Sequence, residues 1–302
     1  MRQGNRKGRS RFVLLGILAP AVIWLVLFLI LPYFNLFSFS FWKNDVFTVR
    51  HEFNLLNYAK FFTESQTGAA PYLVLLDTLK LACWVTVSTL LLSFPLAYFI
   101  RFKVTRYKQA LYMLVIIPLW VSYIMRAYSW KIILGTNGIL NSFLLWLGIV
   151  DTPVSFFLYS DVSVIIGMTH IYTPFVLMPV YTALEQIPQN LIEASNDLGG
   201  NRLRTFLHVV FPLALPGIIT GGTYAFVLSM GDFLAPSLLG GPTSSTKIAN
   251  IVQQQFGTSN NWPYGAAIGI VILVLVLGLL EVTGRLERHF SKLESTSPRT
   301  LR

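Results

Sequence analysis

A few polar and aromatic side chains lie within or beside long apolar runs of this 302-residue chain. Asp232 follows one such run, and its carboxylate could attract a cationic solute. A charged group at the centre of a bilayer costs roughly 3 kcal/mol on insertion scales, so such residues usually face protein or water. The alternative role for Asp232 is that of an interfacial residue that caps a helix or pairs with Arg126 or Lys131.

Aromatic rings could also offer their faces to an ammonium group, each contact being worth on the order of 1 kcal/mol; these are Trp120, Tyr123, Tyr128, Trp130 and Tyr172. Aromatic residues are also common anchors at membrane interfaces, which is the alternative for each of them. His170 is either part of the same pathway or a hydrogen-bonded packing residue, and Asp151 and Asp161 are interpreted as solvated loop residues. The candidate pathway residues are therefore Asp232, Tyr123, Tyr128, Trp130, Tyr172 and His170.

The titratable residues form no recognisable catalytic or metal-binding pattern. The four histidines lie in four different regions of the sequence. The single cysteine, Cys83, can build neither a metal cage nor an intrachain disulfide. No convincing phosphate-binding loop occurs, so any ATP chemistry would belong to another chain. An enzyme is therefore poorly supported, and no metal or cofactor is expected on this chain.

The composition indicates a membrane protein. Hydrophobic residues make up 54% of the chain and charged residues 12%, against roughly 25% charged residues in a soluble domain. The net charge of +10 could suggest a nucleic-acid partner. Basic cytoplasmic flanks of a membrane protein explain the same charge, and its distribution favours them.

Six apolar runs predict an all-α polytopic protein, since about 20 apolar residues span a bilayer core. The first run is too long for a secretory signal peptide and is interpreted as a retained span, while the third is short and contains Pro118. Residues 12–284 form the predicted transmembrane domain. The predicted spans cover about 12–37, 81–100, 109–125, 162–184, 211–232 and 264–281.

The distribution of Lys and Arg predicts the orientation. Sixteen of the 23 basic residues fall in segments that would be cytoplasmic if the N-terminus is inside. This excess matches the positive-inside rule. The predicted cytoplasmic segments are the N-terminus 1–11, the turn 101–108, the loop 185–211 and the end of the chain, with a tail at 285–302.

The loop 185–211 contains a polar stretch with helix start and stop signals. Pro188 suits the first turn of a helix, and Ile187, Leu191, Ala194 and Leu198 then fall on one helical face. Gly199-Gly200 predicts the end of this helix, and Asn201 can cap a second helix that leads into Pro212. On periodicity alone, this would be an amphipathic connector packed on its own bundle.

The spacing in this stretch resembles the EAA loop of ABC-importer permeases. Glu193-Ala194-Ser195 is followed after three residues by Gly199, and after nine more by Val209, one residue and Phe211-Pro212. Ser195, Val209 and Phe211 replace the Ala, Ile and Leu of that pattern. In that family the loop is a cytoplasmic coupling helix that docks on a separate ATPase subunit. The resemblance implies that the coupling residues are Leu191, Glu193, Ala194, Ser195, Asp197 and Gly199.

A second resemblance is more specific. Residues 126–130 (RAYSW) and 137–153 (NGILNSFLLWLGIVDTP) resemble the outer loop of spermidine/putrescine importer permeases. Residues 239–242 (LGGP) and 261–267 (NWPYGAA) are similar to later segments of that group. The resemblance covers most of residues 80–280. It implies the type I ABC-importer permease fold, with six transmembrane helices in a bacterial inner membrane.

The resemblance also implies function and partners. The chain would form half of a translocation pathway for a polyamine, beside a second permease, an ATPase dimer that carries ATP and Mg, and an extracytoplasmic solute-binding protein. Relatives in this branch carry opines and other small solutes, so another solute is the alternative. A self-sufficient secondary carrier and a membrane-embedded enzyme are the alternatives from other classes, and both leave the EAA-like spacing as coincidence.

Overall fold

The computed structural model describes residues 16–44, 49–63, 69–241 and 245–295. Within these residues the chain is helical except for turns, connections and a two-residue antiparallel ladder of β1 (Lys43–Asn44) and β2 (Val49–Arg50). The prediction of an all-α protein is therefore confirmed. The contacts divide the chain into two compact units, Met1–Thr63 with Gln254–Val271, and Glu64–Gln253 with Ile272–Arg302.

The first unit contains the first apolar helix, Gly16–Ser40, whose second half comprises the π-helical turn η1 (Val26–Ile30) and α2 (Leu31–Ser40). The short helix α3 (Leu56–Thr63) is fixed to its end, because Asn57 donates to the backbone carbonyl of Ser40 at 2.9 Å. The basic segment 1–11 and the first residues of the predicted span 12–37 lie outside the described residues.

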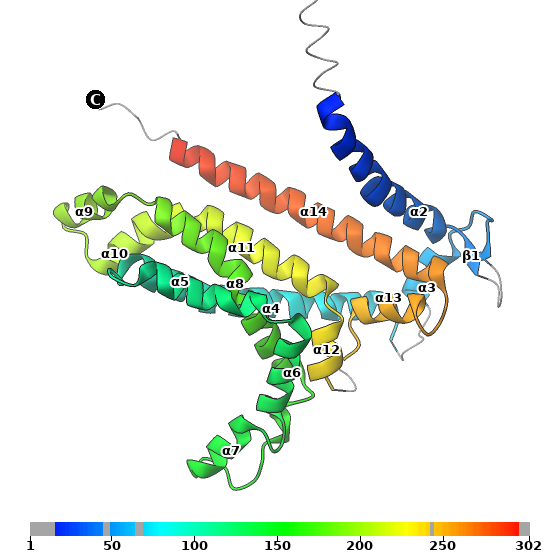
Figure 1. Ribbon diagram of the computed structural model, residues 1–302, viewed down its shortest axis with the longest axis horizontal. Helices are drawn as coiled ribbons and strands as arrows, with labels where there is room; N and C mark the ends of the chain where they lie inside the picture. Colours follow the sequence, from blue (N-terminus) through cyan, green and yellow to red (C-terminus); the bar gives the residue numbers. More distant parts are fainter. Residues whose placement is uncertain (1–15, 45–48, 64–68, 242–244, 296–302) are drawn as a thin grey trace, which may run out of the picture. The chain divides into compact units, whose positions relative to one another are not determined.

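The second unit is built on three long helices that lie side by side (Figure 1). The three helices are α4 (Pro71–Phe102), α8 (Asp161–Gln186) and α11 (Phe211–Gly231). The helices α4 and α8 run in the same direction, because the Arg101 side chain at the end of α4 donates to the carbonyls of Leu184 and Ile187 at the end of α8, at 3.3 and 3.2 Å.

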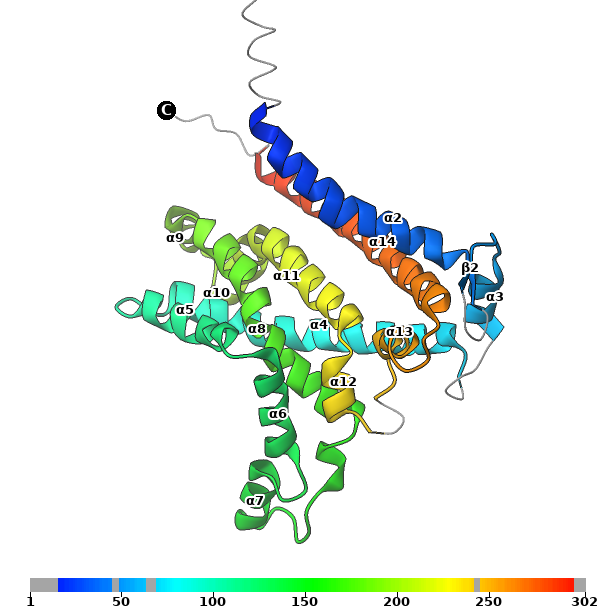
Figure 2. The same cartoon turned by 45° about the vertical axis from the view of Figure 1, so that its right-hand side comes forward.

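Shorter elements connect these helices, and α6 and α7 extend away from them (Figure 2). The connection after α6 is fixed by the buried Asn141, which donates to the carbonyls of Gly135 and Val154 and accepts from the Val154 N–H at 2.8 Å. The shorter elements are α5 (Lys108–Ile116), η2 (Ile117–Trp120), α6 (Tyr123–Leu134), α7 (Ile139–Trp146), η3 (Ser155–Phe157), α9 (Gln189–Asp197), α10 (Arg202–Thr205), η4 (Phe206–Val210), α12 (Leu234–Leu239) and α13 (Ile248–Phe256).

The third apolar run, predicted as a span over 109–125, contains a sharp bend. The helix formed by α5 and η2 ends at Trp120, and the helical segment that begins at Tyr123 makes an angle of 97° with it. Pro118 has no N–H to donate to the preceding turn, which fits the change from α5 to the tighter η2. The bend itself begins at Val121, whose backbone is extended with a ψ of 137°. Among the described residues, five helices are long and apolar enough to cross a membrane, or six if this bent pair is one span.

Three of the helices extend beyond the apolar runs that predict them. The helix α4 begins ten residues before the predicted span 81–100, at Pro71 in its first turn. The fifth helix is continuous over Arg202–Gly231, and α14 (Trp262–Ser295) continues into the predicted tail 285–302. Hydropathy marks only the part of a helix that suits lipid, whereas backbone hydrogen bonds continue until a capping or breaking residue is reached.

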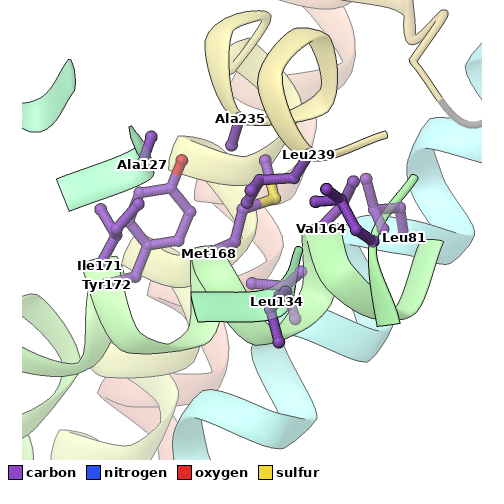
Figure 3. Close-up of a cluster of buried hydrophobic side chains, with 11 residues drawn as sticks. Leu81, Ala127, Leu134, Val164, Met168, Ile171, Tyr172, Ala235 and Leu239 are labelled. Carbon is purple, nitrogen blue, oxygen red and sulfur yellow. The ribbon is translucent and has the colours of Figure 1, made fainter. Parts of the chain in front are cut away.

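The core of the second unit follows one face of α8 (Figure 3). Val164, Met168 and Ile171 are fully buried there, against Leu81 of α4 and Leu239 of α12. Gly167 allows this close approach, because a Cβ atom at that position would lie 2.3 Å from Leu239 Cδ1. The helices α4, α6, α8 and α12 are thereby held together around the pathway candidates.

Candidate functional site

The predicted coupling segment forms a helix that ends in a tight glycine turn. Gly199 has a φ of +80°, a conformation that an L-residue with a side chain adopts at a cost. The Gly200 N–H donates to the Ser195 carbonyl and the Gly199 N–H to the Asn196 carbonyl, both at 2.9 Å. These two bonds define a Schellman motif, which satisfies carbonyls at the end of α9. The predicted stop at Gly199-Gly200 is confirmed.

The turn also contains a constraint that the sequence pattern does not reveal. A Cβ atom at Gly199 would meet nothing within 4 Å, whereas one at Gly200 would lie 2.6 Å from the Ser195 carbonyl oxygen. Gly200 is therefore restricted by a steric contact and Gly199 by its backbone conformation. Only the structure separates these two reasons for a glycine.

We expect Gly200→Ala to disturb the turn more than Gly199→Ala. Gly199→Ala costs about 1–2 kcal/mol through its left-handed backbone. Gly200→Ala must instead displace the Ser195 carbonyl, which accepts the hydrogen bond that closes the turn. Amide hydrogen exchange over residues 189–205 should therefore accelerate more in Gly200→Ala. Equal acceleration in the two variants would contradict the steric argument.

The second helix of the segment begins as the sequence predicts. The Asn201 side chain accepts from the Arg204 N–H at 2.8 Å, which caps α10. The hydroxyls of Ser195 and Thr205 lie 2.9 Å apart and link α9 directly to α10. Because α10, η4 and α11 form one continuous helix, Arg202–Gly231, a displacement of α9 can be transmitted along α11.

The helix α9 presents three different faces. Gln189, Ile192 and Asn196 line one hollow, and the face that carries Leu191, Ala194 and Leu198 lines another, of about 420 Å³. Glu193 and Asp197 line neither hollow. Both are exposed and have no hydrogen-bond or ion-pair partner among the described residues.

The apolar face of α9 is not packed on its own bundle. Ile187 is buried, but Leu191 is exposed and Leu198 has 88% of its surface accessible. The alternative of an amphipathic connector packed on the bundle would require these leucines to be covered by this chain. Within the described residues they are not, so this face is available to another protein.

Of the pathway candidates, the structure brings Asp232, Tyr123 and Tyr172 together. We call these three residues the Asp232 cluster. Both tyrosine hydroxyls donate to Asp232 Oδ2, that of Tyr172 at 2.6 Å. Asp232 Oδ1 accepts from the backbone N–H groups of Leu234 and Ala235, at 2.8 and 3.2 Å. The buried carboxylate therefore caps α12 and uses both of its oxygens, as in the helix-capping alternative.

Asp232 directly follows the end of the fifth helix, as its place in the sequence predicts. This end lies beside Tyr172, near the midpoint of α8. Tyr123 is the first residue of α6, directly after the 97° bend. Two interruptions of the helical backbone therefore meet at Asp232, deep in the helical unit.

The remaining candidates lie in two other groups. The rings of Trp130 and His170 are in contact, with centroids 5.4 Å apart, and the Lys131 ammonium lies 5.9 Å from the Tyr128 ring. Arg126 does not pair with Asp232. It donates instead to the Ile171 carbonyl at 3.1 Å, and its guanidinium lies over the Tyr123 ring.

The sequence reasoning missed a buried ionic group. It lies near the first residues of α4 and α8, at the end opposite to α9. Lys247 precedes α13, is only 1% exposed, and pairs with Asp77 of α4 and, at 3.1 Å, with Asp161 of α8. We call these residues the Lys247 cluster. The interpretation of Asp161 as a solvated loop residue is thus incomplete, because it begins α8 and binds Lys247. The only signal in the sequence was a lone lysine in a Gly/Ser/Asn-rich loop.

Comparison with known proteins agrees with this architecture. Residues 89–292 match the family described as binding-protein-dependent transport system inner membrane component. The chain is 37% identical to the spermidine/putrescine transport system permease protein PotB of Salmonella typhimurium (strain SL1344), over 87% of this chain and 90% of that protein. It is 36% identical to PotB of Escherichia coli (strain K12), over 89% and 96%.

A solved structure shares the fold. One chain of a bacterial alginate ABC transporter, in complex with an alginate pentasaccharide-bound periplasmic protein, matches with a TM-score of 0.75 at 19% identity. The match covers 97% of this chain and 99% of that chain. The predicted type I importer permease fold is thereby confirmed. The chain belongs to the family of inner-membrane components of binding-protein-dependent transport systems, and it is a multi-pass permease subunit rather than an enzyme.

Proposed function

We propose that the chain forms half of the translocation pathway of an importer for a small cationic solute of the polyamine class. The support is the similarity over most of the chain to permeases named for spermidine and putrescine transport. The buried carboxylate of Asp232 adds a negative charge deep in the helical unit, where few other acids occur. An ammonium group would be attracted to it there, because the low dielectric strengthens the interaction.

The partners follow from the same proposal. A second permease completes the pathway, an extracytoplasmic solute-binding protein delivers the solute, and an ATPase dimer with ATP and Mg supplies the energy. The N-terminus and α9 face the cytoplasm in this arrangement. The exposed leucines of α9 support it most directly, since burying each against a partner would contribute about 2 kcal/mol.

The coupling step uses the continuity of the fifth helix. Closure of the ATPase dimer moves α9, and the Schellman turn and the link between Ser195 and Thr205 pass this movement to α10. The helix Arg202–Gly231 then carries it to Asp232, which immediately follows its far end. In this mechanism Gly199 makes the turn, Ala194 and Ser195 permit close docking, and Glu193 and Asp197 make polar contacts with the partner.

The solute meets a carboxylate whose oxygens are already in use. A carboxylate accepts about four hydrogen bonds, and Asp232 accepts four. Direct contact with an ammonium therefore requires a tyrosine hydroxyl to rotate away. Tyr123 is the more mobile candidate, because it begins a helix at a break, whereas Tyr172 lies within α8.

ATP-dependent uptake tests the proposal. The complex is purified with its native partners, reconstituted in proteoliposomes with the solute-binding protein, and supplied with labelled spermidine or putrescine. We expect uptake that requires ATP and ceases with a non-hydrolysable analogue. Uptake by this chain alone without ATP would identify a secondary carrier and contradict the proposal. ATP-dependent uptake of an opine, with none of a polyamine, would contradict the assigned solute class.

A further inference from the structure

We propose that the hollow between the end of α4, the α4–α5 connection, α9 and α10 binds a phosphate-bearing anion. We call it the basic pocket. It has a volume of about 420 Å³, which is within the range of small-molecule sites. The anion is a phospholipid headgroup or a soluble phosphate compound, two sources that share the same recognition chemistry.

The charge of the lining is the first argument. Arg101, Lys103, Lys108 and Arg202 line the pocket, and no Asp or Glu does. Like charges gathered around one hollow repel each other, and an anion held between them removes this repulsion. Arginine and lysine are the residues that bind phosphate in proteins, the former through its planar fork of N–H donors.

The availability of two of these cations is the second argument. Arg101 is engaged with the Leu184 and Ile187 carbonyls, and Lys108 lies 3.5 Å from Glu185. Lys103 and Arg202, in contrast, have no acidic partner among the described residues. They come from the two sides of the pocket, so one anion could bridge the α4–α5 connection to the start of α10.

The apolar part of the lining fits a lipid headgroup as well as a free anion. Tyr98 contacts Phe102 and Phe206, with ring centroids 4.9 and 5.7 Å apart, and all three rings line the pocket. Basic pockets between membrane helices on the cytoplasmic side attract anionic headgroups, because the cytoplasmic leaflet is negative. The assignment of a lipid headgroup rests on the proposed function, which places this end of the helices in the cytoplasm.

A bound anion would stabilise the coupling segment. The pocket includes Gln189, Ile192 and Asn196, the α9 face that carries neither the exposed leucines nor Glu193. Bridging Lys103 to Arg202 would hold the start of α10 against the α4–α5 connection, and with it α9, which is linked to α10 through the hydroxyls of Ser195 and Thr205. The geometry points to a site that sets how freely α9 and α10 move relative to α4.

Arg106 offers a matched control. It is an exposed cation in the same α4–α5 connection, but it lies over the Tyr107 ring and does not line the pocket. Arg106→Gln and Lys103→Gln therefore change the net charge of the same connection equally. Arg202→Gln removes the cation on the other side of the pocket.

The test measures anion binding to the full-length chain, purified with its native partners, in two kinds of nanodisc. Native mass spectrometry counts phosphatidylglycerol retained from mixed phosphatidylglycerol–phosphatidylcholine discs. Phosphorus NMR titration measures inorganic phosphate in discs of phosphatidylcholine alone. We expect Lys103→Gln and Arg202→Gln each to weaken binding about fivefold, as loss of a partly exposed charge-assisted hydrogen bond would. Arg106→Gln should leave it unchanged.

The outcomes distinguish a lipid headgroup from a soluble phosphate compound, and they test the basic pocket separately from the proposed transport function. Retention of phosphatidylglycerol without phosphate binding assigns the lipid headgroup, and phosphate binding assigns a soluble anion. Equal weakening by Arg106→Gln, or no difference between either pocket variant and the unmodified chain, would overturn the site. Neither readout requires transport, so ATP-dependent uptake with no anion binding contradicts this site alone. Anion binding without uptake contradicts only the proposed function.

Discussion

Asp232→Leu should destabilise the protein by about 3 kcal/mol or more, because it removes the acceptor of four hydrogen bonds at a buried site. Two tyrosine hydroxyls and two N–H groups of α12 would then lose their partner. Hydrogen bonds to charged groups contribute about 1.5–3 kcal/mol each, but the contributions of neighbouring bonds do not simply add. Thermal unfolding of the purified protein in detergent measures the loss.

The control for this variant is Asp151→Leu, since Asp151 is an exposed acid in the connection after α7. We expect its unfolding temperature to stay close to that of the unmodified protein. If Asp232→Leu unfolds at the same temperature as Asp151→Leu, the carboxylate does not hold α12, α6 and α8 together.

Asp232→Asn separates the structural role from the proposed solute role. An amide oxygen can still accept from the N–H groups that begin α12, so stability should fall less than in Asp232→Leu. The negative charge is lost, however, and we expect the KM for a cationic solute to rise. An unchanged KM in a stable Asp232→Asn variant would restrict the carboxylate to its structural role.

The double variant Asp77→Asn/Asp161→Asn should lower the free energy of unfolding by about 3–5 kcal/mol, because it leaves the buried ammonium of Lys247 without a counter-charge. Each single variant should cost less than half of this. Both carboxylates are about half exposed, at 48% and 50%, and either one can still pair with the lysine.

Adding Lys247→Met to the double variant provides a sharp control. The triple variant no longer buries a charge, and methionine fills a similar volume, so stability should return toward that of the unmodified protein. Chemical or thermal unfolding of the two single variants, the double variant and the triple variant gives the coupling energy between the two Asp substitutions and the recovery in the triple variant. Additive effects of the two Asp substitutions, with no recovery in the triple variant, would contradict a buried ionic cluster.

The segment 185–211 is the part of the fold that the sequence predicts most completely, because its signals are local. The glycine pair, the Asn201 cap and the spacing of the leucines all depend on neighbours within a few residues, and each is found where it is expected. Apolar runs likewise indicate the long helices, although the helices that contain α4, α11 and α14 extend beyond the runs that predict them.

The rest depends on contacts between residues far apart in the chain. Lys247 lies 170 residues from Asp77, and nothing in its loop predicts that it is buried. The contact between Tyr123 and Asp232 joins two residues 109 positions apart, and the bend directly before Tyr123 is not specified by the local sequence. Periodicity identifies which face of a helix is apolar, but not whether that face meets the same chain or another one, as Leu198 illustrates.

Cross-linking from Leu198 tests most directly whether α9 meets an ATPase. The native thiol is exposed, so Leu198→Cys is made in a Cys83→Ser background, with Leu147→Cys after α7 as the control. A short thiol-to-amine reagent is applied to native membrane vesicles, and the adducts are identified by mass spectrometry. We predict an adduct with the ATPase subunit at position 198 and none at position 147. Labelling of position 198 only from the extracytoplasmic side would contradict the account.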